Sequence, residues 1–209
     1  MNTIQPLPAD LKSVIGTEKI DFSIVAKRKQ PLNKSLGIIS FGIIWSAFIS
    51  IFVIAFLGPL FKGEEVHFKV NDEPTTASWD NFEPMLVPSL IIGLFVVVGI
   101  AILISGFYSF FQKGGHFVGT ENRLIHYQKG TIKTYDWEQF SGNMEINSRK
   151  EDLSMELRTG KMVSRKNKPD EYVPDVLHIS GVANILEIEK TCRNRIKEND
   201  TTPATILNT

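Results

Sequence analysis

Charged side chains are missing from two long stretches of this 209-residue chain. Neither residues 35–61 nor residues 84–112 contain an Asp, Glu, Lys or Arg. Each stretch exceeds the roughly 20 residues that cross about 30 Å of hydrocarbon as a helix. A buried helix of a soluble protein is shorter and carries a polar stripe, and a cleavable signal peptide would start nearer the N-terminus. The sequence therefore predicts two transmembrane helices, at residues 35–61 and 85–112.

Cysteine is nearly absent as well. Cys192 is the only one, so the chain cannot form an intramolecular disulfide, as is usual for a cytoplasmic domain. We expect this thiol to fill a small space in a core.

Catalytic and metal-binding patterns are also missing. The chain contains no CxxC, HExxH, GxSxG, Walker or Rossmann motif. Its four histidines are dispersed, and Glu64, Glu65 and His67 on one short acidic loop would form a poor coordination shell. We therefore expect a protein that is not an enzyme, with no catalytic residues, no cofactor and no metal.

The formal net charge is zero, but the charges are separated along the chain. Cations exceed acids before the first span, whereas acids exceed cations between the spans. Because cytoplasmic flanks collect Lys and Arg, we expect a plasma (inner) membrane protein with both termini in the cytoplasm. The predicted layout is a cytoplasmic N-terminal arm (1–34), a first span (35–61), an extracytoplasmic acidic loop (62–84), a second span (85–112), a cytoplasmic domain (113–200) and a disordered tail (201–209).

Small residues recur at four-residue spacing in both spans, where they let helices approach closely. They are Gly42, Ser46 and Ser50 in the first span and Ser89 and Gly93 in the second. We expect the spans to pack as an antiparallel hairpin. The same stripes would serve self-association, and the sequence leaves both uses open.

Short strands are predicted on both sides of the spans. In the N-terminal arm, Ile20, Phe22 and Ile24 alternate with more polar residues, which predicts a strand without an assigned partner. After the second span, Lys129-Gly130 predicts a two-residue hairpin turn. Its register would place Gln128 opposite Thr131, and further along Tyr127 opposite Ile132, Leu124 opposite Tyr135, His126 opposite Lys133 and Arg123 opposite Asp136.

More strands are predicted downstream. A second hairpin is expected around residues 148–152, and a third turn at Thr159-Gly160 would pair Leu157 with Met162. We interpret residues 164–174 as a loop, followed by a strand at 176–180. About seven short strands result. A helix then follows, with Ser180 as its N-cap and one apolar face formed by Ile185, Ile188, Cys192 and Ile196.

The stretch HFVGTENRLIHYQKGTIKTYDW, with its T-x-x-R-L-I pattern of Thr120, Arg123, Leu124 and Ile125, resembles the opening of the bacterial pleckstrin-homology (PH) domains found on small membrane proteins. This resemblance implies an α+β membrane protein in which a transmembrane hairpin is followed by a PH-like seven-stranded antiparallel β-barrel, capped by a C-terminal α-helix. The first loop between strands, GTENR, lacks the basic pattern of phosphoinositide-binding PH domains. The resemblance therefore does not imply inositide specificity.

Two functions from different classes remain open. The first is a scaffolding module in the bilayer that binds a protein partner or self-associates. The second is a sensor of anionic lipid headgroups through a basic loop. Acidic residues directly after that loop weaken the second hypothesis, which rests on Lys161, Arg165, Lys166 and Lys168. Because the chain has no domain-wide basic face, we expect no nucleic-acid partner, and no motif indicates a small-molecule substrate.

Overall fold

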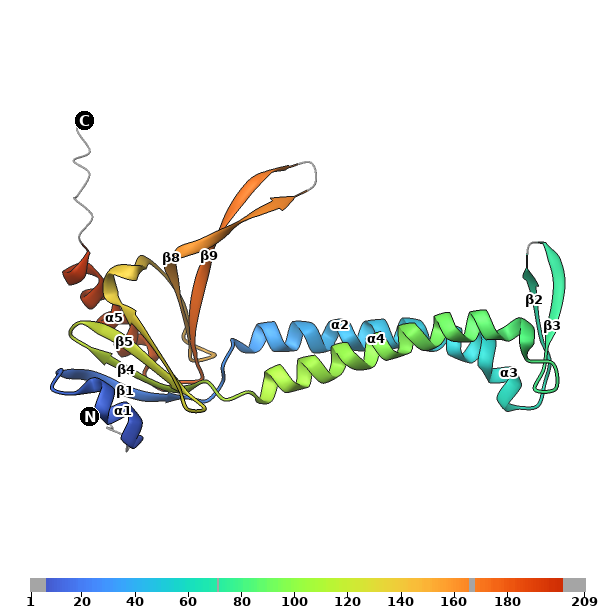
Figure 1. The fold of residues 1–209 in the computed structure, drawn as a ribbon, viewed down its shortest axis with the longest axis horizontal. Coiled ribbons are helices and arrows are strands. Elements are labelled where there is room, and N and C mark those ends of the chain that lie inside the picture. Colours follow the sequence, from blue (N-terminus) through green and yellow to red (C-terminus); the bar gives the residue numbers. More distant parts are fainter. Residues whose placement is uncertain (1–6, 71, 166–167, 201–209) are drawn as a thin grey trace. The chain divides into compact units, whose positions relative to one another are not determined.

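The structure is a computed structural model that describes residues 7–70, 72–165 and 168–200 (Figure 1). The chain forms two compact units. We call residues 33–110 the helical unit, and residues 1–32 together with 111–209 the sheet unit. The predicted tail at 201–209 lies outside the described residues.

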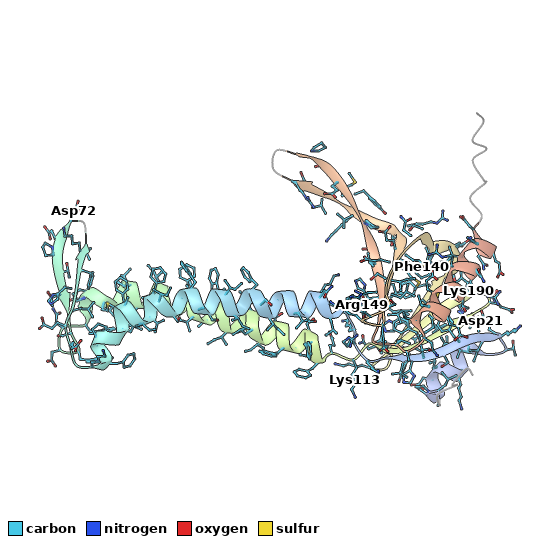
Figure 2. The ribbon with its side chains drawn as sticks, turned by 180° about the vertical axis from the view of Figure 1, so that it is seen from behind. Asp21, Asp72, Lys113, Phe140, Arg149 and Lys190 are labelled. Atoms are coloured by element: carbon cyan, nitrogen blue, oxygen red, sulfur yellow. The ribbon has the colours of Figure 1, made fainter. Side chains whose placement is uncertain are left out.

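Two long helices dominate the helical unit and confirm the prediction of two long apolar helices. They are α2 (Leu32–Phe52) and α4 (Leu86–Phe111), and both are long and apolar enough to cross a membrane. Only 11% of the most apolar window of each is buried, whereas the core helix of a soluble protein is mostly buried. Figure 2 shows their side chains pointing outward along the length of both helices.

The two helices pack through a seam of buried residues at seven-residue spacing. The seam contains Ser35, Gly42 and Ile49 of α2 and Ile92, Gly99 and Gly106 of α4. Seven-residue spacing is the repeat of helices that cross at a shallow angle. The Trp45 indole N–H donates to the Phe95 carbonyl oxygen at 3.1 Å.

The segment between the helices is more ordered than a loop. After α2, the backbone widens into a π-helix (Val53–Leu57) before α3 (Gly58–Phe61), at a point where Pro59 has no N–H to donate to the preceding turn. Strands β2 (Val66–Val70) and β3 (Glu73–Ala77) then form a hairpin, with Asp72 at its tip in Figure 2, and the 3₁₀ turn Glu83–Met85 leads into α4. A small core holds this segment together and contains Leu60, Val66, Ala77 and Met85.

The described residues of the sheet unit form two open antiparallel sheets and two helices. The first sheet has the order β1-β4-β5-β6 and the second the order β7-β8-β9. Their bounds are β1 (Ile20–Ala26), β4 (Gly115–Thr120), β5 (Arg123–Gln128), β6 (Thr131–Asp136), β7 (Phe140–Asn147), β8 (Asp152–Arg165) and β9 (Lys168–Ser180), with a 3₁₀ turn at Trp137–Gln139.

The N-terminal arm is part of the first sheet. Its strand β1 pairs with β4, for example Ile24 opposite Phe117. The partner strand that the sequence left unassigned therefore comes after both long helices in the chain. Helix α1 (Ala9–Ile15) covers the outer face of this sheet, with Leu11 and Ile15 in one cluster with Val118 and Ile125.

The predicted register of the β5–β6 hairpin is confirmed at every pair. Lys129 and Gly130 have φ of 50° and 80°, as the favoured two-residue turn requires. The hairpin expected around residues 148–152 is also present, with Ile146 opposite Leu153.

The prediction of a turn at Thr159-Gly160 is wrong. Strand β8 continues through both residues, and Met162 lies opposite Tyr172 rather than Leu157. Residues 168–174, predicted as loop, belong to β9. The described part of residues 113–200 therefore holds six strands and not seven, and the other strand of the two sheets is β1 from the N-terminal arm.

Helix α5 (Ile185–Asn199) closes the main core of the sheet unit. Its four predicted apolar residues, Ile185, Ile188, Cys192 and Ile196, are all buried there, which confirms the predicted face. Ser180 is not the N-cap, because it ends β9 and a turn with Gly181 and Asn184 at positive φ precedes the helix. Phe140, labelled in Figure 2, and Trp137 are fully buried in the same core.

Candidate interaction surface

The outer parts of β8 and β9 form a two-stranded ribbon that projects from the rest of the sheet unit (Figure 1). We call residues 158–165 with 168–176 the extension. Strand β7 pairs with β8 only up to Leu157. Among the described residues, β8 beyond that point pairs with β9 and with no other strand. At the base of the ribbon, the Arg158 side chain also donates to the Phe140 carbonyl oxygen and to Asp200.

One face of the extension exposes apolar side chains. Met162, Tyr172 and Val176 are 62%, 50% and 40% exposed. Tyr172 and Val176 are four residues apart on one strand, so both point to the same face, and Met162 lies opposite Tyr172. Beyond the end of α4, the described sheet unit exposes one other large apolar side chain, Leu186 on α5. We call Met162, Tyr172 and Val176 the apolar stripe.

Gly160 and Tyr172 shape the base of the extension. A Cβ on Gly160 would lie 2.5 Å from the Val173 carbonyl oxygen and 2.8 Å from both Cα of Pro174 and Cζ of Tyr172. The backbone of β9, with the Tyr172 ring beside it, therefore leaves no room for a larger residue. The Tyr172 hydroxyl donates to the Arg158 carbonyl oxygen at 2.8 Å. The aromatic ring therefore stiffens the ribbon and still presents half of its surface to solvent.

The residues predicted to contact anionic lipid lie on or beside the extension. Lys161 and Arg165 are exposed on β8, Lys166 lies outside the described residues, and Lys168 is the first residue of β9, with a side chain that is not described. Arg165 is already paired with Glu171 across the strands at 3.0 Å. The structure thus brings a cation and an acid together where the sequence indicated a basic loop.

The T-x-x-R-L-I motif fastens the N-terminal arm to the β4–β5 turn. The Thr120 hydroxyl donates to Glu18 at 2.7 Å and accepts the Arg123 backbone N–H at 3.1 Å. The Arg123 guanidinium forms an ion pair with Glu18 and donates to the Val14 carbonyl oxygen at 3.1 Å.

The other two motif residues pack on opposite faces of the same sheet. Leu124 enters the main core, and Ile125 lies in the cluster under α1. In this structure, the four motif residues therefore stabilise the fold and do not line an open site.

Further ion pairs tie the N-terminal arm to distant elements. Asp21 binds Arg195 of α5 through two hydrogen bonds of 2.7 and 2.8 Å, and this carboxylate raises the Arg195 pKa. Arg28 pairs with Asp152 at 3.3 Å and donates to the Lys150 carbonyl oxygen at 2.7 Å.

The small residues singled out in the spans lie in different surroundings. A Cβ on Gly42 would lie 2.7 Å from Leu103, and one on Gly99 would lie 3.2 Å from the Ser46 hydroxyl. Ser50 is exposed and Ser89 is partly buried, and a Cβ on Gly93 would meet no heavy atom within 4 Å. Gly99 and Gly106 are not among the predicted packing residues, although they are small residues at the seven-residue spacing of the seam.

The histidines take part in local contacts. His67 lies 3.1 Å from the Thr76 hydroxyl. His126 stacks on Phe117, and its Nε2 lies 2.7 Å from the Gly114 carbonyl oxygen. Burial, with a smaller contribution from Lys133, lowers the His126 pKa. Within the described ranges, no group of three or more His, Cys, Asp or Glu side chains is placed to hold a metal ion.

Comparison of the chain with protein-family models, with curated proteins and with solved structures finds no match.

Proposed function

We propose that this protein is a non-enzymatic, two-span protein of the inner membrane whose sheet unit is a cytoplasmic protein-interaction module. The observation that carries the proposal is the apolar stripe. Solvent-exposed apolar side chains grouped on one face, beside charged residues, are typical of surfaces that bind other proteins. The contact surface is the face of the extension that carries the stripe.

The membrane assignment is supported by the helices and by the charge distribution. Apolar side chains cover the outside of α2 and α4, where only lipid or other apolar helices would shield them from water. The basic residues before α2 and Lys113 after α4 favour cytoplasmic termini. The β2–β3 hairpin then lies on the extracytoplasmic side.

We also propose that the sheet unit is PH-like. In support, a four-stranded and a three-stranded antiparallel sheet precede a C-terminal helix that enters their core. In this interpretation β1 is the first strand of the domain, and the transmembrane hairpin is inserted between the first and second strands. A fold of this kind does not define a function, so the function is argued from the apolar stripe.

Lipid sensing is the second candidate, because Lys161 and Arg165 are exposed on the extension. The pairing of Arg165 with Glu171 and the nearby acids Asp170 and Asp175 offset their positive charge. An anionic headgroup would have to compete with these acids, which makes the protein-interaction function the better supported one.

Site-specific photocrosslinking of the full chain in its membrane tests the proposal. A photoreactive residue replaces Met162 or Tyr172, and the matched control replaces Lys133, which is exposed on β6. We expect protein adducts from the two stripe positions and none from the control. Adducts to lipid alone, abolished by Lys161→Glu with Arg165→Glu, would favour the lipid sensor. The absence of any adduct specific to the stripe would contradict both candidates.

A further inference from the structure

We infer that one end of the sheet unit binds the anionic lipid headgroups of the cytoplasmic leaflet, an inference that rests on the membrane assignment of the proposed function. This end is formed by the end of β1, the start of β4, the β5–β6 turn and the β7–β8 turn. Exposed cations lie there, and we call them the basic collar: Lys27, Lys29, Lys113, Lys129 and Arg149. None of these residues belongs to the extension.

The charges of the first sheet are divided between its two ends. The half that contains the end of β1 and the start of β4 has no Asp or Glu, and its cations are Lys27, Arg28, Lys29, Lys113, Lys129 and Lys133. In the other half acids outnumber cations, and these acids are Glu18, Asp21, Glu121, Asp136 and Glu138. Figure 2 shows Lys113 and Arg149 at one end of the sheet unit and Asp21 toward the other. A body with such a division of charge turns its positive end toward an anionic surface.

Two ion pairs hold the β7–β8 turn, which carries Arg149, against the end of β1. Arg28 pairs with Asp152 at 3.3 Å, and Lys27 pairs with Glu151 at 3.7 Å. These pairs occupy the two acids at the end of the turn. The Arg149 side chain is exposed, so it adds its charge to that of the cations beside β1.

The β5–β6 turn is held at the same end of the sheet unit. The Gln128 side-chain amide donates to the Lys113 carbonyl oxygen, and a Cβ on Gly115 would lie 3.1 Å from Cβ of Gln128. The tip of the turn therefore lies beside the start of β4. Lys129 is exposed at this tip, next to the point where the chain returns from α4.

Chain connectivity keeps the basic collar close to the bilayer surface. Lys29 lies three residues before the start of α2, and Lys113 lies two residues after the end of α4. Because an extended chain spans at most about 3.6 Å per residue, both Cα atoms lie within about 11 Å of a helix end. The potential of an anionic leaflet acts over a similar distance, about 8 Å at physiological ionic strength. A topology signal needs cations only within about 20 residues of a span, whereas Arg149 lies much further along the chain and is brought there by the fold.

Fluorescence quenching in liposomes tests the lipid contact of the full chain. A fluorophore is attached at Ser148→Cys, an exposed position next to Arg149, or at Asn122→Cys, an exposed position of the β4–β5 turn at the opposite end. Cys192 is the only native cysteine and is fully buried, so it does not react. Lipids with a nitroxide on the headgroup quench a nearby fluorophore. We expect stronger quenching at Ser148→Cys when phosphatidylglycerol is added to phosphatidylcholine vesicles, and weak quenching at Asn122→Cys in both.

Neutralised variants identify the cations that make the contact. Lys129→Asn with Arg149→Gln removes two charges of the basic collar, and Asn before Gly130 suits the two-residue turn. Each cation near an anionic leaflet strengthens attachment about fivefold, so we expect the ratio of attached to detached sheet units to fall at least about tenfold. The matched control, Lys161→Gln with Arg165→Gln, removes two charges from the extension and should leave the quenching unchanged.

Quenching that is equal in the two kinds of vesicle, or that survives the loss of the Lys129 and Arg149 charges, would overturn the inference. Loss of quenching only in the variant of the extension would also overturn it and would assign the lipid contact to the extension. Alkaline extraction of the same vesicles tests the membrane assignment separately. An extracted protein would refute both the spans and the basic collar, whereas a retained protein without lipid-dependent quenching refutes the collar alone. Photocrosslinking at the apolar stripe tests the protein-interaction function independently of both.

Discussion

Glu18 precedes β1, yet its carboxylate is held by the β4–β5 turn 102 positions later in the sequence. Burial alone would raise the Glu18 pKa, but hydrogen bonds from Thr120 and Arg123 and the charge of Arg123 outweigh burial, so the pKa is lowered. A carboxyl group with a lowered pKa in the folded state stabilises that state whenever it is ionised. Single residues of the T-x-x-R-L-I motif thus join the N-terminal arm to the sheet.

We predict that Glu18→Gln lowers the free energy of unfolding of the sheet unit by about 1–2 kcal/mol at neutral pH. The carboxylate contributes fully to the free energy of unfolding above its ordinary pKa of about 4.5. This contribution is lost as the pH falls through the lowered pKa of the folded state. The variant should therefore approach the wild type in acid. Thermal unfolding of the full chain, measured across this pH range, checks the prediction. Glu121→Gln, an exposed carboxylate of the same turn, is the control, and a deficit of equal size at every pH would contradict the proposed ionic role.

Among the structural elements, the α2–α4 pair depends on glycines at its seam. A Cβ on Gly106 would lie 2.8 Å from the Ile39 side chain and 3.2 Å from the Ile39 backbone nitrogen. The backbone cannot move as a side chain tip can, so a larger residue must separate the helices. Close by, the hydroxyls of Ser35 and Ser109 are 3.0 Å apart, which provides a measure of helix proximity.

We predict that Gly106→Leu slows disulfide formation between Ser35→Cys and Ser109→Cys at least about tenfold in the bilayer, because the separated helices rarely bring the thiols to bonding distance. Gly93→Leu, on the same helix but with no heavy atom within 4 Å of its Cβ position, should leave the rate unchanged. Disulfide formation is followed by gel mobility after mild oxidation. If the two leucine variants form the disulfide at the same rate, the seam is not the contact that holds α2 against α4.

Local patterns predicted some elements well. The β5–β6 register follows from a two-residue turn and the pairs beside it, and α5 follows from four apolar residues on one face. The prediction of a turn within β8 was wrong because Thr159-Gly160 has the composition of a turn. The close contact of Gly160 with the β9 backbone at Val173 and Pro174 leaves no local pattern in the sequence. The pairing of β1 with β4 leaves no local pattern because the partners are separated by both long helices. The apolar stripe was not predicted either, because it forms only when β8 and β9 pair, whereas the cations of the extension lie close together in the sequence.

At the scale of the whole molecule, the helical unit is an insertion between two neighbouring strands of one sheet. The chain leaves the sheet unit after β1 and returns before β4, and these two points are in contact. The Lys29 backbone N–H donates to the Gln112 carbonyl oxygen at 2.9 Å, and the Gly114 N–H donates to the Ala26 carbonyl oxygen at 3.1 Å. The sheet unit therefore needs chain from both sides of the helical unit to be complete.

Residues 113–200 alone lack β1 and α1. Without these elements, Phe117 of the main core and the Val118–Ile125 cluster under α1 would be exposed to water, and Arg195 and Asp152 would lose their partners Asp21 and Arg28. Each uncovered large apolar side chain costs roughly 1.5–3 kcal/mol, and a domain is stable by only about 5–15 kcal/mol in total. The loss of several such contacts is enough to prevent folding.

We therefore predict that a chain in which residues 7–29 are joined to residues 112–200 by a short Gly-Ser link folds as a soluble domain, whereas residues 113–200 alone do not. The link is short because the two ends are already hydrogen-bonded, so closing the loop costs little entropy. Size-exclusion chromatography and cooperative thermal unfolding compare the two chains.

In the linked chain, Arg195→Met should lower the melting temperature, because it removes the ion pair between Asp21 of β1 and α5. The exposed substitution Lys133→Met is the matched control. Cooperative folding of residues 113–200 alone would show that β1 is dispensable, and an unfolded linked chain would show that the sheet unit needs the helical unit for more than chain connection.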